Sequence, residues 1–143
     1  MNLKWKSLDR WSDAGLLIIR AGIGALFMIV HGYPKLAGGP AAWASVGRAV
    51  GYLGIDFGHT AWGFAAAVTE TLGGLLLILG WAHRPAALAL FITMVVASIW
   101  KYYPAVLDVM GGWTSAGHPV AMAVVCLGLL FTGPGKYSLD AKS

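Results

Sequence analysis

The chain has 143 residues, of which 58% are hydrophobic and 11% are charged, and its mean hydropathy is +0.71. A soluble domain has about 25% charged residues, so this chain cannot cover a water-soluble globule with polar side chains. The formal net charge of +4 comes from scattered Lys and Arg residues without a basic run, which argues against a nucleic-acid-binding protein. We therefore expect a single integral membrane domain, residues 1–143, in contact with the lipid bilayer.

Four apolar segments, separated by Gly, Pro and charged residues, predict four membrane-spanning helices. They cover approximately residues 13–32, 60–80, 85–103 and 117–132. The last segment is shorter than the roughly 20 residues that a bilayer requires, although residues 111–115 could extend it. The predicted fold class is therefore all-α, an integral membrane four-helix bundle.

The long connection between the first two spans, residues 33–58, predicts a short interfacial helix. Trp43, Val46, Val50 and Leu53 follow one another at spacings of three and four, which places them on one apolar helix face. An ordered loop that covers the bundle is the alternative interpretation.

An even number of spans places both termini on the same side of the membrane. That side carries more Lys and Arg than the opposite side, so the positive-inside rule predicts cytoplasmic termini. The basic residues on the side of the termini are Lys4, Lys6, Arg10, Arg84, Lys136 and Lys142, and those on the other side are Lys35, Arg48 and Lys101.

Two charged residues fall inside the predicted spans: Arg20 in the first, and Glu70, the only glutamate of the chain, in the second. A charge at mid-bilayer costs roughly 2.5–3.5 kcal/mol on insertion scales, so neither is expected to be unpaired. At a rise of about 1.5 Å per residue, both would lie about 10–15 Å above the inner edge of the membrane. We therefore predict a direct Arg20–Glu70 ion pair, which either fixes the helix register or takes part in catalysis.

Histidines lie near the outer ends of the predicted spans. Arg20 and His31 are eleven residues apart and share one helix face, and His59 and Glu70 share a face for the same reason. If the two spans are antiparallel, His31 and His59 come together at the outer end of the bundle, here called the outer mouth. Either histidine alone could simply face headgroups or water. The candidate cofactor-binding residues of this mouth are His31, His59, Lys35 and His118, and the candidate catalytic residues are Arg20 and Glu70.

Established cofactor motifs are missing from the sequence. It contains no HxxxH or HExxH spacing and no Walker or GxGxxG loop after a strand, so no metal site is expected. The separated histidines are a weak signal, but a bound metal ion or haem remains conceivable, because neutral imidazole is a good ligand. Cys126 is the only cysteine, so no internal disulfide can form.

Three motifs occur in a characteristic order along the chain. Arg20 and Phe27 precede HGYPKL at 31–36, ETLGGLLLILGWAHRPAAL follows at 70–88, and GPGKYSLD closes the chain at 133–140. In this combination the chain resembles the DoxX family of small four-helix membrane proteins, over roughly residues 14–140. The resemblance implies the four-helix fold and a bacterial or archaeal cytoplasmic membrane.

The resemblance also implies a link to quinone chemistry, because the family is named after a subunit of a thiosulfate:quinone oxidoreductase system. The leading hypothesis is a quinone-reactive oxidoreductase or a quinone-docking subunit, with the quinone head between the first two spans. Electrons would then come from a protein partner, a bound haem or the substrate itself. The first alternative is a non-catalytic anchor or assembly subunit. The second is a small permeation protein, which would have to form a homo-oligomer to enclose a pore.

Overall fold

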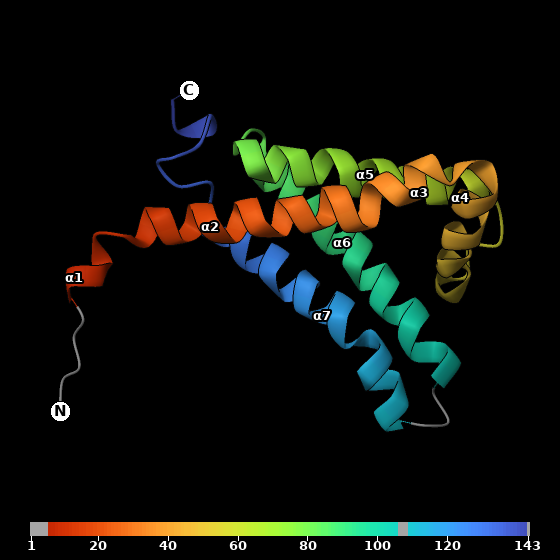
Figure 1. Cartoon of the computed structure of the whole chain (residues 1–143). Helices are drawn as coiled ribbons and strands as arrows, with labels where there is room; N and C mark the ends of the chain where they lie inside the picture. The colour runs from red at the N-terminus through yellow and green to blue at the C-terminus, as the bar shows by residue number, and fades with distance from the viewer. Residues whose placement is uncertain (1–5, 106–108, 143) are drawn as a thin grey trace.

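The computed structural model describes residues 6–105 and 109–142, and this part of the chain is helical apart from short turns (Figure 1). No strand occurs among these residues. Four helical segments are long and apolar enough to cross a membrane, and they cover Ser12–Ala37, His59–Leu79, His83–Tyr102 and Met110–Thr132. The predicted all-α fold with four spans is confirmed.

The first span is longer than predicted and contains an irregular segment. After the short helix α1 (Lys6–Asp9), it consists of α2 (Ser12–Ala25), the π-helix η1 (Leu26–Gly32) and α3 (Tyr33–Ala37). A π-helix has wider turns than an α-helix, and this one ends two residues before Pro34, which has no N–H to donate to the preceding turn. The helix therefore continues five residues beyond the predicted end.

The second and third spans form a tight helical hairpin of α5 (His59–Leu79) and α6 (His83–Tyr102). Gly80 adopts a left-handed conformation with φ of 63°, and the Trp81 N–H donates to the Leu76 carbonyl at 3.1 Å. This geometry is a common helix terminator that favours glycine. Both helices begin and end within two residues of the predicted bounds, and α6 continues into the short 3-10 helix η3 (Tyr103–Ala105).

The fourth span, α7 (Val109–Thr132), begins eight residues earlier than the predicted 117. Pro119 was expected near the start of the span, but it lies well inside the helix, and Gly112 packs against the Tyr102 ring. Tertiary packing therefore outweighs the weak local helix propensity of this segment. As a consequence His118, expected at the start of the span, lies well inside the helix.

The connection between the first two spans contains the predicted helix, but this helix packs onto the protein. It consists of α4 (Gly39–Gly47) and the 3-10 helix η2 (Arg48–Leu53). The backbone of α4 lies directly against the first turns of α5, since a Cβ atom at Gly47 would collide with the His59 carbonyl. The connection is therefore helical and also covers the bundle.

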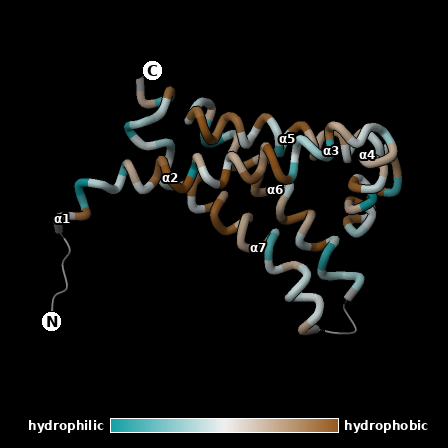
Figure 2. The backbone as a smooth tube through the Cα atoms, viewed as in Figure 1, coloured by the Kyte–Doolittle hydropathy of each residue, from teal (hydrophilic) through white to brown (hydrophobic). Residues whose placement is uncertain are grey.

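The first span lies antiparallel to α5, whereas α6 and α7 pack side by side and run obliquely to these two (Figure 1). Hydrophobic residues follow the spans along their length (Figure 2), and many large ones face outward, including Ile18, Val124 and Phe131. This surface suits contact with lipid. The core between the helices contains the fully buried side chains of Phe27, Leu77, Leu90 and Cys126.

Candidate functional site

Both intramembrane charges are buried, but they do not pair with each other. Arg20 and Glu70 are each 1% exposed. The guanidinium of Arg20 donates to the backbone carbonyls of Leu77 and Ile78, at 3.0 and 3.2 Å, whereas the carboxylate of Glu70 accepts from Lys35. The predicted Arg20–Glu70 ion pair is therefore wrong by about two helical turns of α5.

Close glycine contacts explain this register. A Cβ atom at Gly24 would lie 2.5 Å from the Gly74 carbonyl oxygen, and one at Gly32 would collide with Thr71. Small residues let membrane helices approach closely and so fix their relative position. The helix face expected from the sequence is correct, since Arg20, Gly24 and Phe27 are all buried. Only the position along that face was wrong.

Arg20 closes the end of α5 and holds the C-terminal segment. Its two acceptors Leu77 and Ile78 lie in the last turn of α5, whose carbonyls lack partners within the helix. A positive charge is favourable at this end of a helix dipole. The same guanidinium also donates to the carbonyl of Tyr137. These contacts give Arg20 a structural role.

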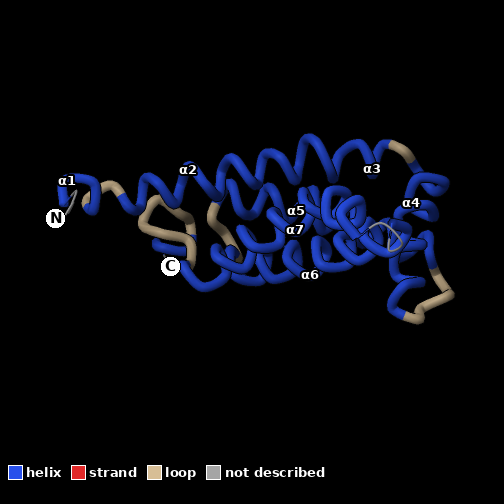
Figure 3. The backbone as a smooth tube through the Cα atoms, turned by 90° about the horizontal axis from the view of Figure 1, so that it is seen from below, coloured by secondary structure: helices blue, strands red, loops and turns tan. Residues whose placement is uncertain are grey.

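The C-terminal segment 136–140, here called the C-terminal clasp, binds the α5–α6 turn. The Leu139 and Asp140 N–H groups donate to the carbonyls of Leu79 and Gly80, at 3.2 and 3.0 Å. In return, the Asp140 carboxylate accepts from the N–H groups of Ala82 and His83 at the start of α6, where a negative charge is favourable. The clasp thus ties the chain terminus to the turn (Figure 3).

The buried carboxylate of Glu70 has a different partner, Lys35. The Lys35 Nζ donates to both Glu70 oxygens at 2.6 Å, and the side chain of Lys35 is 26% exposed. The Trp43 indole donates to the Lys35 carbonyl at 2.8 Å, which ties α4 to α3. Glu70 is therefore a charge-paired acid at the middle of a membrane-spanning helix.

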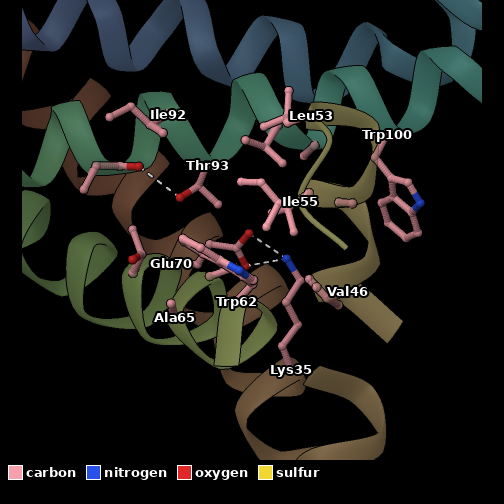
Figure 4. Close-up of a pocket in the computed structure, with 18 residues that line it drawn as sticks. Lys35, Val46, Leu53, Ile55, Trp62, Ala65, Glu70, Ile92, Thr93 and Trp100 are labelled. Atoms are coloured by element: carbon pink, nitrogen blue, oxygen red, sulfur yellow. Dashed lines mark hydrogen bonds and ion pairs between the residues drawn. The ribbon is translucent and has the colours of Figure 1, made fainter. Parts of the chain in front are cut away.

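This ion pair lies in the wall of a cavity of about 450 Å³ (Figure 4). The cavity is open on one side and is bounded by α5, α6, the end of α4 and the connecting η2, and its lining is largely apolar. A mostly apolar cavity with a few convergent polar groups is the common form of a small-molecule site. The lining comprises Lys35, Val46, Gly47, Ala49, Val50, Leu53, Ile55, Trp62, Ala65, Ala66, Thr69, Glu70, Ala89, Ile92, Thr93, Val96, Ala97 and Trp100.

The polar groups of the cavity are few. Thr69 and Thr93 line it beside the ion pair, and the Thr93 hydroxyl donates to the Ala89 carbonyl at 2.9 Å, which leaves its oxygen free to accept. Trp62 and Trp100 add two aromatic rings to the wall. The cavity therefore offers an ammonium donor, a carboxylate and hydroxyl groups to an otherwise apolar ligand.

The expected cluster of histidines and lysine is divided among three places. His31 meets His118, with their Nε2 atoms 3.1 Å apart. Lys35 belongs to the cavity. His59 lies at the start of α5 beneath α4, where its Nε2 is buried without a hydrogen-bond partner in the described part of the chain. Only Lys35 and Glu70, of the six predicted site residues, line the cavity.

Sequence reasoning missed the cavity walls on α6 and η2. One signal was present, since Val46, Val50 and Leu53 had been assigned to one apolar face of a helix, and this face lines the cavity. The α6 wall, with Ala89, Thr93 and Ala97, carries no comparable signal, because a span that is apolar all round shows no distinct face.

The fold and the cavity define a four-span membrane protein in which a buried carboxylate pairs with a partly exposed lysine beside an apolar site. The DoxX family model matches residues 15–102, and the chain belongs to this family of small membrane proteins. The match includes Arg20, His31, Lys35, His59 and Glu70, and it ends before α7 and the C-terminal clasp. No curated protein and no solved structure matches the chain.

Proposed function

We propose that this protein is a quinone-binding subunit of a membrane redox complex, and that the cavity beside Lys35 and Glu70 takes up the quinone head. The observation that supports this most is a buried carboxylate and ammonium pair in the wall of an apolar cavity of about 450 Å³. A quinone head is apolar on its ring faces and carries two carbonyl acceptors. An apolar cavity with an ammonium donor suits both features.

The ion pair supplies the polar chemistry of this site. Lys35 donates a hydrogen bond to a quinone carbonyl, and Glu70 holds and releases a proton beside it. Reduction of one quinone to a quinol consumes two electrons and two protons, so a buried acid at the carbonyl is a suitable relay. The electrons come from a reduced protein partner of the complex.

The site also differs in place from the one expected between the first two spans. The cavity lies between α5, α6 and η2, and the first span contributes only Lys35. Arg20 acts outside the reaction, because its hydrogen bonds hold α5 and the clasp.

We place the protein in a bacterial or archaeal cytoplasmic membrane with both termini in the cytoplasm. Arg84 and Lys136 lie at the α5–α6 turn and the clasp, on the side of the termini, and the positive-inside rule favours the cytoplasm for such residues. With this orientation, the part of the cavity that Lys35 lines lies in the outer half of the membrane.

Binding of a short-chain quinone to the purified protein tests the proposal. Trp62 and Trp100 line the cavity, so a bound quinone should quench part of the tryptophan fluorescence at saturable concentrations. Ala89→Phe fills the cavity and should weaken binding by about tenfold or more, since an overpacked site cannot accept the ring. Leu88→Phe, one residue away and 44% exposed, is the matched control and should bind as the wild type does. Equal quenching of all three proteins would contradict the proposal.

A purely structural anchor subunit, the alternative, predicts a different effect of Glu70→Gln on quinone turnover. Glu70→Gln keeps the shape of the side chain and a hydrogen bond to Lys35, but it cannot carry a proton. In membranes that contain the complex, we expect quinone binding to remain and quinone turnover per molecule of protein to fall by about 100-fold or more. An anchor would show reduced amounts of complex with unchanged turnover.

A further inference from the structure

A second polar contact of the membrane domain lies outside the cavity and has no part in the proposed quinone site. His31 of η1 and His118 of α7 are 87 residues apart in the chain, and their Nε2 atoms are 3.1 Å apart. The two rings stack with centroids 5.1 Å apart and an angle of 30° between their planes. Two spans that are distant in sequence thus bring their Nε2 atoms within hydrogen-bond distance of each other.

This separation is that of two ligands of one metal ion. Imidazole nitrogens bind Zn²⁺ at about 2.0–2.1 Å, which places two tetrahedral ligands about 3.3 Å apart and two neighbouring square-planar ligands about 2.9 Å apart. The observed 3.1 Å lies between these values. Two axial ligands of a haem would instead be about 4 Å apart, with the iron between them, so the pair does not fit a haem.

We propose that His31 and His118 bind a single transition-metal ion that prefers imidazole, such as Cu²⁺ or Zn²⁺. In the metal-free protein, one Nε2–H donates to the other Nε2. For the ion to bind both rings, the proton of that donor Nε2 moves through water to Nδ1 of the same ring, so that both rings stay neutral and each offers an unprotonated Nε2 to the metal.

The exposure of the pair gives a cation access to both rings, and the nearby lysine is already paired. His118 is exposed and His31 is half-buried, so an ion can reach both from the surface. Lys35, four residues after His31, is neutralised by Glu70. No group of three or more His, Cys, Asp or Glu that could hold a metal occurs in the described ranges, so water or an external ligand fills the other positions, as in metal sites that keep an open position.

The helix irregularity at His31 is typical of a functional site. His31 lies in the π-helix η1, which interrupts an otherwise α-helical span. Such π segments occur frequently at functional sites. Phe27 packs beside His31, with ring centroids 6.2 Å apart, and is itself fully buried. The His31 ring is therefore held by its neighbours before any ion binds.

Metal titration of the purified protein tests this site. The protein carries a tag without histidine and is titrated with Cu²⁺ and, in a separate experiment, with Zn²⁺. We expect one ion per chain, and for Cu²⁺ an electron paramagnetic resonance spectrum with coupling to two nitrogens. Since even outer-shell partners change metal affinity by about 10–100-fold, His31→Ala and His118→Ala should each weaken binding by about 100-fold or more.

His59→Ala is the matched control, because His59 lies at the start of α5 and does not contact the pair. This variant should bind one ion with wild-type affinity. Binding that survives in the double variant His31→Ala/His118→Ala, or a wild-type protein that binds neither ion, would overturn the proposal. Circular dichroism of each variant separates loss of the ligands from loss of the fold. The outcome is independent of quinone binding, so either proposal can fail alone.

Discussion

Lys35 and Glu70 form an ion pair in which the Lys35 Nζ lies 2.6 Å from both carboxylate oxygens, and this pair joins the C-terminal end of the first span to the middle of the second. Glu70 lies near the middle of α5, so the pair does not cap that helix. The pair therefore joins two spans of the bundle and also lines the apolar cavity in which we propose that the quinone binds.

Removal of one partner of the Lys35–Glu70 pair should lower the free energy of unfolding more than removal of both. Lys35→Met leaves the Glu70 carboxylate buried without a partner, and we expect it to lower the free energy of unfolding by about 3 kcal/mol. The double variant Lys35→Met/Glu70→Leu removes both charges and should recover most of this loss. Thermal unfolding of the proteins in detergent measures the two effects.

Lys101→Met is the control for the lysine variant, because Lys101 is exposed in the last turn of α6. It should unfold at the wild-type temperature. A Lys35→Met protein as stable as the wild type would show that the ion pair does not stabilise the bundle.

Arg20 should hold the C-terminal clasp in place. Arg20→Met removes hydrogen bonds to Leu77, Ile78 and Tyr137, and charged hydrogen bonds contribute about 1.5–3 kcal/mol each. We expect trypsin to cleave after Lys136 at least about tenfold faster in this variant. Arg20→Lys should be intermediate, because an ammonium lacks the planar fork of a guanidinium.

Arg10→Met is the comparison for this experiment, since Arg10 is exposed and stacks over Trp11. Its clasp should be cleaved at the wild-type rate. If Arg20→Met and Arg10→Met are cleaved alike, Arg20 does not anchor the clasp.

The glycine contact between the first two spans should determine their register. A Cβ atom at Gly24 would lie 2.5 Å from the Gly74 carbonyl oxygen, whereas one at Gly22 would meet nothing within 4 Å. Gly24→Ala should therefore lower the free energy of unfolding by about 1–3 kcal/mol. Gly22→Ala should leave it unchanged or raise it slightly, because alanine is the better helix former. Equal unfolding temperatures for the two variants would show that the two spans can move apart without loss of stability.

The sequence was sufficient for the fold because composition and span length determine it. Charges, glycines and prolines bound the apolar segments, and α5 and α6 match their predicted limits within two residues. The start of α7 was missed because Gly112 is a weak helix former in isolation and a proline such as Pro119 is typical of a first helical turn, whereas the contact of Gly112 with Tyr102 appears only in the folded chain.

The candidate site shows what a helix face can and cannot reveal. Periodicity placed Arg20 and Glu70 on the faces that meet, and both are buried. It could not supply the register, because that depends on close contact between glycines of two helices. The shift brought Lys35, rather than Arg20, to Glu70.

The central claim is that a quinone occupies the cavity beside Lys35 and Glu70, and a photoreactive quinone tests it most directly. After illumination of the protein in membranes, mass spectrometry identifies the labelled peptides. We predict labels within residues 46–55, 62–70 and 89–100, which form the cavity walls, and their loss in the presence of excess unlabelled quinone or in Ala89→Phe. Labels found mainly at lipid-facing residues such as Val124 and Phe131, unchanged by either treatment, would contradict it.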